Sequence, residues 1–164
     1  MFKLDLKRLS RISLTVLLLI LSVGSHAQDS SDSVSSKAQL QQLLDANIGK
    51  VIYLDFWASW CIPCRKSFPW MNAMEAKYAE QGFKVITVNV DVEKSLAIDF
   101  LQENPASFSI IYDPKGIIAK EFKLKGMPSS YMINKLGKPV SAHVGFYNDK
   151  KADYEAEIIK LLEN

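Results

Sequence analysis

Apolar and polar positions alternate along this chain with the periods of strands and helices. Residues 51–57 are almost continuously apolar and rich in strand-forming side chains, which predicts a central parallel strand covered on both faces. Residues 84–91 predict a second buried strand. Between these strands, residues 61–80 carry large apolar side chains three or four positions apart, which is the pattern of a helix that packs on a core.

The second half of the chain continues this alternation and ends with a hairpin and a helix. We expect, in order, a helix over residues 95–103, a strand over 108–112, a short helix or extended piece over 117–122, two hairpin strands over 129–134 and 139–145, and an amphipathic helix over 150–162. Strands and helices that alternate ahead of a late hairpin are typical of an α/β fold with a mixed central sheet flanked by helices.

The N-terminus has the three-part composition of a secretory signal peptide. Basic residues come first, residues 12–23 are apolar, and small residues precede Ala27. This apolar run is too short to cross a membrane as a helix, which takes about 20 residues. We therefore expect residues 1–27 to be a signal peptide cleaved near Ala27, and the protein to be periplasmic or otherwise exported. An uncleaved N-terminal anchor is the alternative.

Residues 28–36 are polar and of low complexity, so we expect them to form a flexible linker. A short helix over residues 37–46, with Ser36 as a candidate cap, then begins the folded domain. The predicted organisation is a signal peptide over residues 1–27, a linker over 28–36 and one domain over 37–164, which is long enough to bury a sizeable core.

The charge balance excludes one class of partner. Residues 1–27 hold four Lys or Arg and one Asp, so without them the 20 basic and 18 acidic residues of the chain become 16 and 17. A chain with no basic excess has little to neutralise a phosphate backbone. We therefore expect no nucleic acid among the partners.

Two cysteines occur in the chain, Cys61 and Cys64, so any thiol chemistry is confined to them. They lie where the first predicted strand gives way to a helix. Free N–H groups and the helix dipole at such a point stabilise a thiolate and can lower a cysteine pKa from about 8.5 to roughly 3.5–7.5. We expect Cys61 to be the nucleophile and Cys64, one turn into the helix, to be the resolving thiol. Pro63 favours the helix start and keeps the sulfur atoms within bonding range.

Other interpretations of the cysteine pair are weaker. A zinc site needs more ligands, whereas residues 28–164 hold no further cysteine and one histidine, His143. A purely structural disulfide would close so short a loop that it would stabilise the fold little. A chance occurrence is disfavoured by the strand before the pair and the helix after it.

Asp55 is the single charged residue of the first predicted strand. Burial disfavours a charged carboxylate, raises its pKa and lets it exchange protons near neutral pH. Because Asp55 lies on the strand that leads to Cys61, we expect it to carry protons to and from Cys64 through water. The alternative is an aspartate held in a satisfied hydrogen bond.

Three further features occur together within residues 37–164. They are the segment DFWASWCIPC over residues 55–64, Pro69 five positions after Cys64, and Gly126-Met127-Pro128 ahead of the predicted hairpin. Together they resemble the thioredoxin superfamily, which implies a thioredoxin-like fold. The 36 residues between Asp91 and Pro128 resemble the central insertion of exported TlpA/ResA-like thiol-disulfide oxidoreductases, placed between the second buried strand and the cis-proline loop.

The resemblance also implies where a substrate binds. Pro128 would follow a cis peptide bond and lie against the disulfide, and the backbone of Met127 would pair with the incoming substrate strand. A cis bond ahead of a predicted strand agrees with the usual place of such prolines. Trp60, Ile62 and Pro63 would complete the substrate-binding surface.

The implied activity is the reduction of protein disulfides in the periplasm by a monomer that a membrane thiol reductant recharges. No cofactor is implied besides the redox-active Cys61–Cys64 disulfide, and cytochrome c maturation is one setting. One departure from the ResA-like pattern favours a broader reductant. ResA-like proteins tend to lack an aspartate at the position of Asp55 and use a glutamate of the insertion instead. The glutamate of this chain that comes nearest to that position, Glu93, is offset by one residue. Thr87 stands where thioredoxins often have a basic partner for the aspartate.

The alternative function is that of a copper metallochaperone of the exported thioredoxin-fold type, with Cys61, Cys64 and His143 as ligands. Such proteins usually place the cysteines one residue further apart, so the spacing around Pro63 argues against it. A non-catalytic binding module that keeps only the fold is disfavoured by the presence of both cysteines and Pro128.

Overall fold

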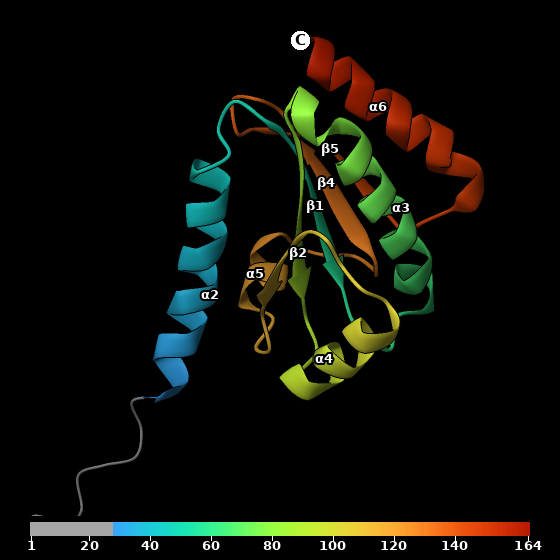
Figure 1. Cartoon of the computed structure of the whole chain (residues 1–164). Coiled ribbons are helices and arrows are strands. Elements are labelled where there is room, and N and C mark those ends of the chain that lie inside the picture. Colours follow the sequence, from blue (N-terminus) through green and yellow to red (C-terminus); the bar gives the residue numbers. More distant parts are fainter. Residues whose placement is uncertain (1–27) are drawn as a thin grey trace, which may run out of the picture. The chain divides into compact units, whose positions relative to one another are not determined.

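Five strands form one mixed sheet in the spatial order β3-β2-β1-β4-β5 (Figure 1). The computed structural model describes residues 28–164, and the predicted signal peptide lies outside them. The strands are β1 Val51–Trp57, β2 Phe83–Asn89, β3 Ser109–Tyr112, β4 Ser129–Ile133 and β5 Pro139–Val144. β1, β2 and β3 run parallel, whereas β4 is antiparallel to β1 and β5 is antiparallel to β4. The predicted α/β fold with a mixed sheet is therefore confirmed.

Helices cover both faces of this sheet. They are α2 Gln28–Asp45, α3 Ile62–Tyr78, α4 Lys94–Glu103, α5 Ile117–Glu121 and α6 Lys151–Glu163, with 3-10 turns at η1 Ala79–Gln81 and η2 Asn148–Lys150. Within residues 28–164, none of the helices has the length and apolar character that a membrane span needs.

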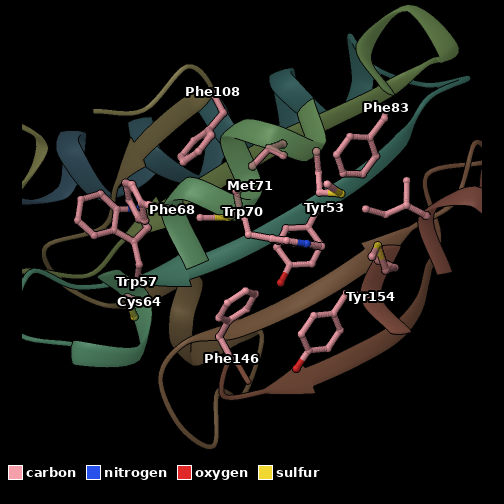
Figure 2. Packing of buried hydrophobic residues seen from close by; sticks show 14 of the residues in the cluster. Tyr53, Trp57, Cys64, Phe68, Trp70, Met71, Phe83, Phe108, Phe146 and Tyr154 are labelled. Carbon is pink, nitrogen blue, oxygen red and sulfur yellow. The ribbon is translucent and has the colours of Figure 1, made fainter. Parts of the chain in front are cut away.

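Alternate residues of β1 point into two separate apolar layers. Trp57 belongs to the layer beneath α3, where it meets Phe68, and Figure 2 shows this layer from close by. Phe56 belongs to the layer on the other face, together with Leu40 of α2 and Ile118 of α5. Because both faces are covered, every residue of β1 is buried, as its continuous apolar character predicts.

The N-terminal helix is longer than the sequence predicts. Residues 28–36, which we expected to form a flexible linker, belong to the first half of α2. They contain neither proline nor glycine, so their backbone chemistry does not end the helix ahead of Ser36. Ser36 lies in the middle of α2 and is buried, so it does not cap the helix. The predicted domain boundary at Lys37 therefore coincides with no change of secondary structure.

The predicted central insertion, residues 92–127, holds α4, β3 and α5. Its strand β3 pairs with β2 and extends the sheet at that edge. β2 ends at Asn89, earlier than expected, because the Asn89 side-chain oxygen accepts the Asp91 N–H at 3.2 Å and turns the chain out of the sheet. Since β1 and β2 are parallel, the insertion begins at the sheet end where α3 begins.

Candidate active site

Cys61 and Cys64 form a disulfide at the start of α3, with an S–S distance of 2.05 Å. Cys61 caps this helix, because its sulfur accepts the N–H of Cys64 at 3.3 Å. Pro63 lies in the first turn, where its missing N–H leaves no helical hydrogen bond unmade. The Cys61 sulfur thus occupies a position where N–H groups and the helix dipole stabilise negative charge. The predicted location of the pair at a strand-to-helix junction is confirmed.

Both cysteines are buried, whereas the apolar residues next to them in the sequence are exposed. Cys61 is 3% exposed and Cys64 is fully buried. Their neighbours Trp60 and Ile62 are 65% and 69% exposed. Exposed apolar side chains therefore flank Cys61 on both sides in the sequence.

A buried carboxylate holds the loop that leads from β1 to Cys61. Asp91 accepts hydrogen bonds from the Ser59 N–H at 2.9 Å, the Ser59 hydroxyl at 2.8 Å and the Asn89 amide at 2.7 Å. These donors take the place of water around the carboxylate. Sequence reasoning did not assign Asp91 to the site. The signal that could have found it is a charged residue at the end of a predicted buried strand, on the side of the sheet where the cysteines lie.

The peptide bond between Met127 and Pro128 is cis, as the resemblance implies. Ser129, the next residue, pairs with Phe56 near the end of β1. The Pro128 carbonyl accepts the Gly145 N–H at 2.8 Å, which ties the loop to the end of β5. Met127 packs against the apolar cluster that contains both cysteines. The cis-proline loop and the start of α3 therefore lie at the same end of the sheet.

Asp55 is buried in the middle of β1, and neither of its carboxylate oxygens has a hydrogen-bond partner among residues 28–164. Burial raises the pKa of Asp55 well above its ordinary value of 3.8. Strand alternation directs its side chain to the same face as Tyr53 and Trp57, which is the face that α3 covers. The alternative of an aspartate satisfied by a hydrogen bond finds no donor in this part of the chain.

The residues opposite Asp55 on the adjacent strands carry hydroxyl groups. Thr87 of β2 and Ser130 of β4 lie in register with it. The Thr87 hydroxyl accepts the Trp57 indole N–H at 3.2 Å and donates to the Ser109 carbonyl at 3.2 Å. Thr87 thus lies opposite Asp55 on the neighbouring strand, and burial accounts for the raised pKa of Asp55.

Glu93 and His143 contribute no ligand cluster to the site. Glu93 precedes α4, is exposed and makes no capping hydrogen bond. His143 of β5 has its Nε2 2.8 Å from Oε2 of Glu157 on α6. Among the residues that the structure describes, no group of three or more His, Cys, Asp or Glu side chains is placed to hold a metal ion. The geometry therefore does not support a copper site built from Cys61, Cys64 and His143.

This sheet, with a cysteine pair at a helix start and a cis-proline loop beside it, defines a protein of thioredoxin-like fold. A protein of Chlorobium tepidum assigned as thiol:disulfide interchange protein DsbE superposes with a TM-score of 0.71 at 48% identity, over 73% of this chain and 84% of that one. StoA of Bacillus subtilis superposes with a TM-score of 0.56 at 27% identity, over 66% and 83%. The Redoxin family model matches residues 22–158, so the chain belongs to the Redoxin family.

Several relatives of known name are thiol-disulfide oxidoreductases. The thiol-disulfide oxidoreductase ResA of Bacillus thuringiensis subsp. konkukian is 34% identical over 92 residues, which are 56% of this chain and 53% of the relative. ResA of Bacillus subtilis is 28% identical over 112 residues, or 68% and 63%. The chain thus spans between about half and two thirds of these relatives. The predicted resemblance to TlpA/ResA-like proteins is confirmed at the level of the family.

Proposed function

We propose that the chain is a periplasmic thiol-disulfide oxidoreductase that reduces disulfide bonds in other proteins. The observation that carries the proposal is the Cys61–Cys64 disulfide at the N-terminus of α3, at the sheet end that also bears the cis-proline loop. The names of the ResA relatives and of the DsbE-assigned protein support the same chemistry here.

The reaction starts from the reduced pair. The Cys61 thiolate attacks one sulfur of a substrate disulfide, the substrate S–S bond breaks, and the departing sulfur takes up a proton. Cys64 then loses its proton and attacks the Cys61 sulfur of the mixed disulfide. This step releases the second substrate thiol and leaves the Cys61–Cys64 disulfide, the state that the structure contains. Two electrons pass to the substrate, and a membrane thiol reductant restores the dithiol.

Asp55 supports the second step of this reaction. Burial raises the pKa of Asp55, so its carboxyl group binds a proton more readily than an exposed aspartate does, and the activation of Cys64 requires such a proton acceptor. It lies on the face of the sheet beneath α3, the helix that carries Cys64. A bridging water completes the path between the two groups in this proposal.

The substrate-binding surface in this proposal consists of the exposed side chains beside the disulfide, Trp60, Ile62 and Pro63, and of the backbone at Met127 ahead of the cis-proline. In this proposal a signal peptide directs the protein to the periplasm, where it acts as a monomer. Apocytochromes c are one candidate class of substrate because of the ResA-like resemblance.

Trapping of mixed disulfides tests the proposal. Cys64→Ser leaves the nucleophile but removes the resolving thiol, so it should accumulate covalent complexes with proteins of the cell envelope, visible on non-reducing gels and lost on addition of dithiothreitol. Cys61→Ser is the matched control and should trap none. Equal trapping by both variants would show that the two roles are wrongly assigned, and wild-type protein that reduces disulfides no faster than a free dithiol would contradict the activity.

A further inference from the structure

A groove lies beside the disulfide, between the loop that leads to Cys61 and the insertion helix α4. It is lined by Ser59 and Trp60 of the loop, by Arg65 of α3 and by four residues of α4. In Figure 1, α4 lies at the end of the sheet toward which β1 and β2 point. The central insertion therefore supplies one wall of a groove whose other wall is built from Ser59, Trp60 and Arg65, the residues on either side of the cysteine pair in the sequence.

The floor of this groove is apolar. Phe100 of α4 is buried and packs against Trp57 and Phe68, with ring centroids 4.9 Å and 5.0 Å away. Above it, Leu96 and Trp60 leave 47% and 65% of their surfaces exposed. Large apolar side chains that gather along one concave surface are a feature of sites that bind a partner.

The α4 side of the groove is acidic. Asp99 and Glu103 are four positions apart on the helix and so share one face. Arg65 offsets part of this charge, because its Nη1 lies 4.0 Å from Oε2 of Glu103. Asp99 makes neither a hydrogen bond nor an ion pair with any residue in the described part of the chain. Two carboxylates against one guanidinium leave the groove with one unpaired negative charge.

The basic residue of α4 and the basic residue of the groove lining both have other contacts. Lys94, at the start of α4, has its ammonium group 4.3 Å from the centre of the Tyr112 ring and is held there. Arg65 is likewise held, since its Nη2 donates to the Ser59 carbonyl at 3.4 Å and its guanidinium lies 5.6 Å from the centre of the Phe100 ring.

We propose that this groove binds the substrate polypeptide next to its disulfide and selects segments that pair an apolar side chain with a lysine or arginine. The apolar side chain occupies the floor between Trp60 and Leu96, and the cation lies against Asp99. This inference rests on the proposed reductase function and adds the class of sequence that the reductase prefers. The insertion thereby acts as a specificity element.

Matched peptides test the preference. Each peptide carries one internal disulfide, with Ala-Leu-Lys, Ala-Leu-Glu or Ala-Ala-Lys on both sides of it. The dithiol form of the protein reduces the peptide in a single turnover, and acid quench followed by chromatography measures the rate. Wild-type protein should reduce the Leu-Lys peptide at least about threefold faster than the Leu-Glu peptide, which is the scale of an exposed ion pair. It should also prefer Leu-Lys to Ala-Lys, and the Lys-to-Glu ratio should fall at 1 M salt, where the Debye length is about 3 Å.

Variants locate the preference. In the double variant Asp99→Asn with Glu103→Gln the Lys-to-Glu ratio should fall to one or below, because Arg65 is then the only charge left in the lining. In Leu96→Ala the Leu-to-Ala ratio should fall. Asp45→Asn is the matched control, because it removes one exposed negative charge from the end of α2, just ahead of β1 and so at the opposite end of the sheet, and should keep both ratios.

The outcomes separate this inference from the proposed function. If wild-type protein reduces all three peptides at equal rates, the groove does not select substrates, but the proposed reductase activity stands. A preference for Lys that persists in the double variant would have the same meaning for the charged residues of the groove. Failure to reduce the peptides and hydroxyethyl disulfide alike would contradict the reductase itself. A dimer that forms with increasing concentration and disappears in Leu96→Ser would assign the groove to a second copy of the chain and overturn the proposal.

Discussion

At the scale of single residues, two buried aspartates near the cysteines show opposite environments. Asp55 has no hydrogen-bond partner within residues 28–164, whereas Asp91 accepts three hydrogen bonds. Burial without donors favours the neutral form of Asp55, whereas the three donors around Asp91 fix the position of its side chain. The first environment is suited to proton transfer and the second to holding a loop in place.

Asp55 should make the stability of the protein depend on pH. Its pKa is higher in the folded state than the value of about 3.9 in an unfolded chain, so ionisation favours unfolding as the pH rises. Relative to wild type, Asp55→Asn should therefore gain stability from about pH 4 upward until the folded-state pKa is passed, by at most about 1.4 kcal/mol per pH unit. Urea unfolding of the oxidised proteins across this pH range measures the difference.

The same variant tests the role of Asp55 in exchange. Asp55→Asn should slow the resolution of a mixed disulfide near neutral pH, because the proton acceptor for Cys64 is lost. Rapid mixing followed by acid quench measures the rate of this step. If the free energies of unfolding of wild type and Asp55→Asn change with pH in the same way, and the rate of resolution is unchanged, Asp55 has a purely structural role.

Asp91 should matter for both stability and reactivity. Asp91→Asn replaces one acceptor oxygen by an N–H donor that faces the existing donors of Ser59 and Asn89, and we expect a loss of about 2 kcal/mol in the free energy of unfolding. The loop ahead of Cys61 then loses its anchor, so alkylation of the reduced Cys61 should change in rate as well. Ser59→Ala removes the hydroxyl alone and should cost about 1 kcal/mol. An Asp91→Asn protein with wild-type stability and alkylation rate would show that the loop is held by other contacts.

At the scale of elements, α3 carries the chemistry at its first turn and anchors the core one turn later. Phe68 is buried there, with its ring centroid 4.8 Å from that of Trp57, 5.0 Å from that of Phe100 and 5.3 Å from that of Phe108. Edge-to-face contacts of this kind contribute beyond the area that they bury. Phe68 thus joins the cysteine helix to β1, to α4 and to the segment that enters β3.

Truncation of Phe68 tests this joint. Phe68→Ala should lower the free energy of unfolding by about 3–5 kcal/mol, because it removes a large side chain from the core and leaves a cavity. Ile98→Ala on the exposed face of α4 is the control and should stay within about 0.5 kcal/mol of wild type. Chemical unfolding followed by circular dichroism measures both, and similar losses in the two variants would contradict the assignment.

At the scale of the whole molecule, the sheet brings together segments that are far apart in the chain. The cysteine helix follows β1, Asp91 follows β2 and the cis-proline loop precedes β4, and all three meet at one end of the sheet. The insertion adds β3 at one edge and α4 beside the cysteines. The site is therefore composed of four separate segments that one sheet holds in register.

The N-terminus is tested on the intact protein. If residues 1–27 are a signal peptide, protein isolated from the cell envelope should begin at Gln28, and its intact mass should match residues 28–164. Light scattering should give the mass of a monomer. A chain that begins at Met1 and stays with the membrane would favour the uncleaved anchor instead.

Much of the fold follows from local chemistry. The continuous apolar run of β1, the helical spacing in α3 and the turn residues before β5 identify their elements correctly, since each pattern reflects which faces are buried. The start of α2 was missed, because the polar composition of residues 28–36 is compatible with both a linker and a helix, and no proline or glycine distinguishes the two. The cysteine pair and the cis-proline were both predicted from sequence, as was the place of Thr87 on the strand beside Asp55.

The sequence by itself determined the fold class, the redox pair and the burial of Asp55, because these depend on periodicity and on residues that lie close together in the chain. Only the tertiary structure decided that Asp91 holds the loop at Ser59 and that α4 forms a groove beside Trp60. Both arise from contacts between residues more than thirty positions apart, and such contacts depend on strand order and register, which no local pattern encodes.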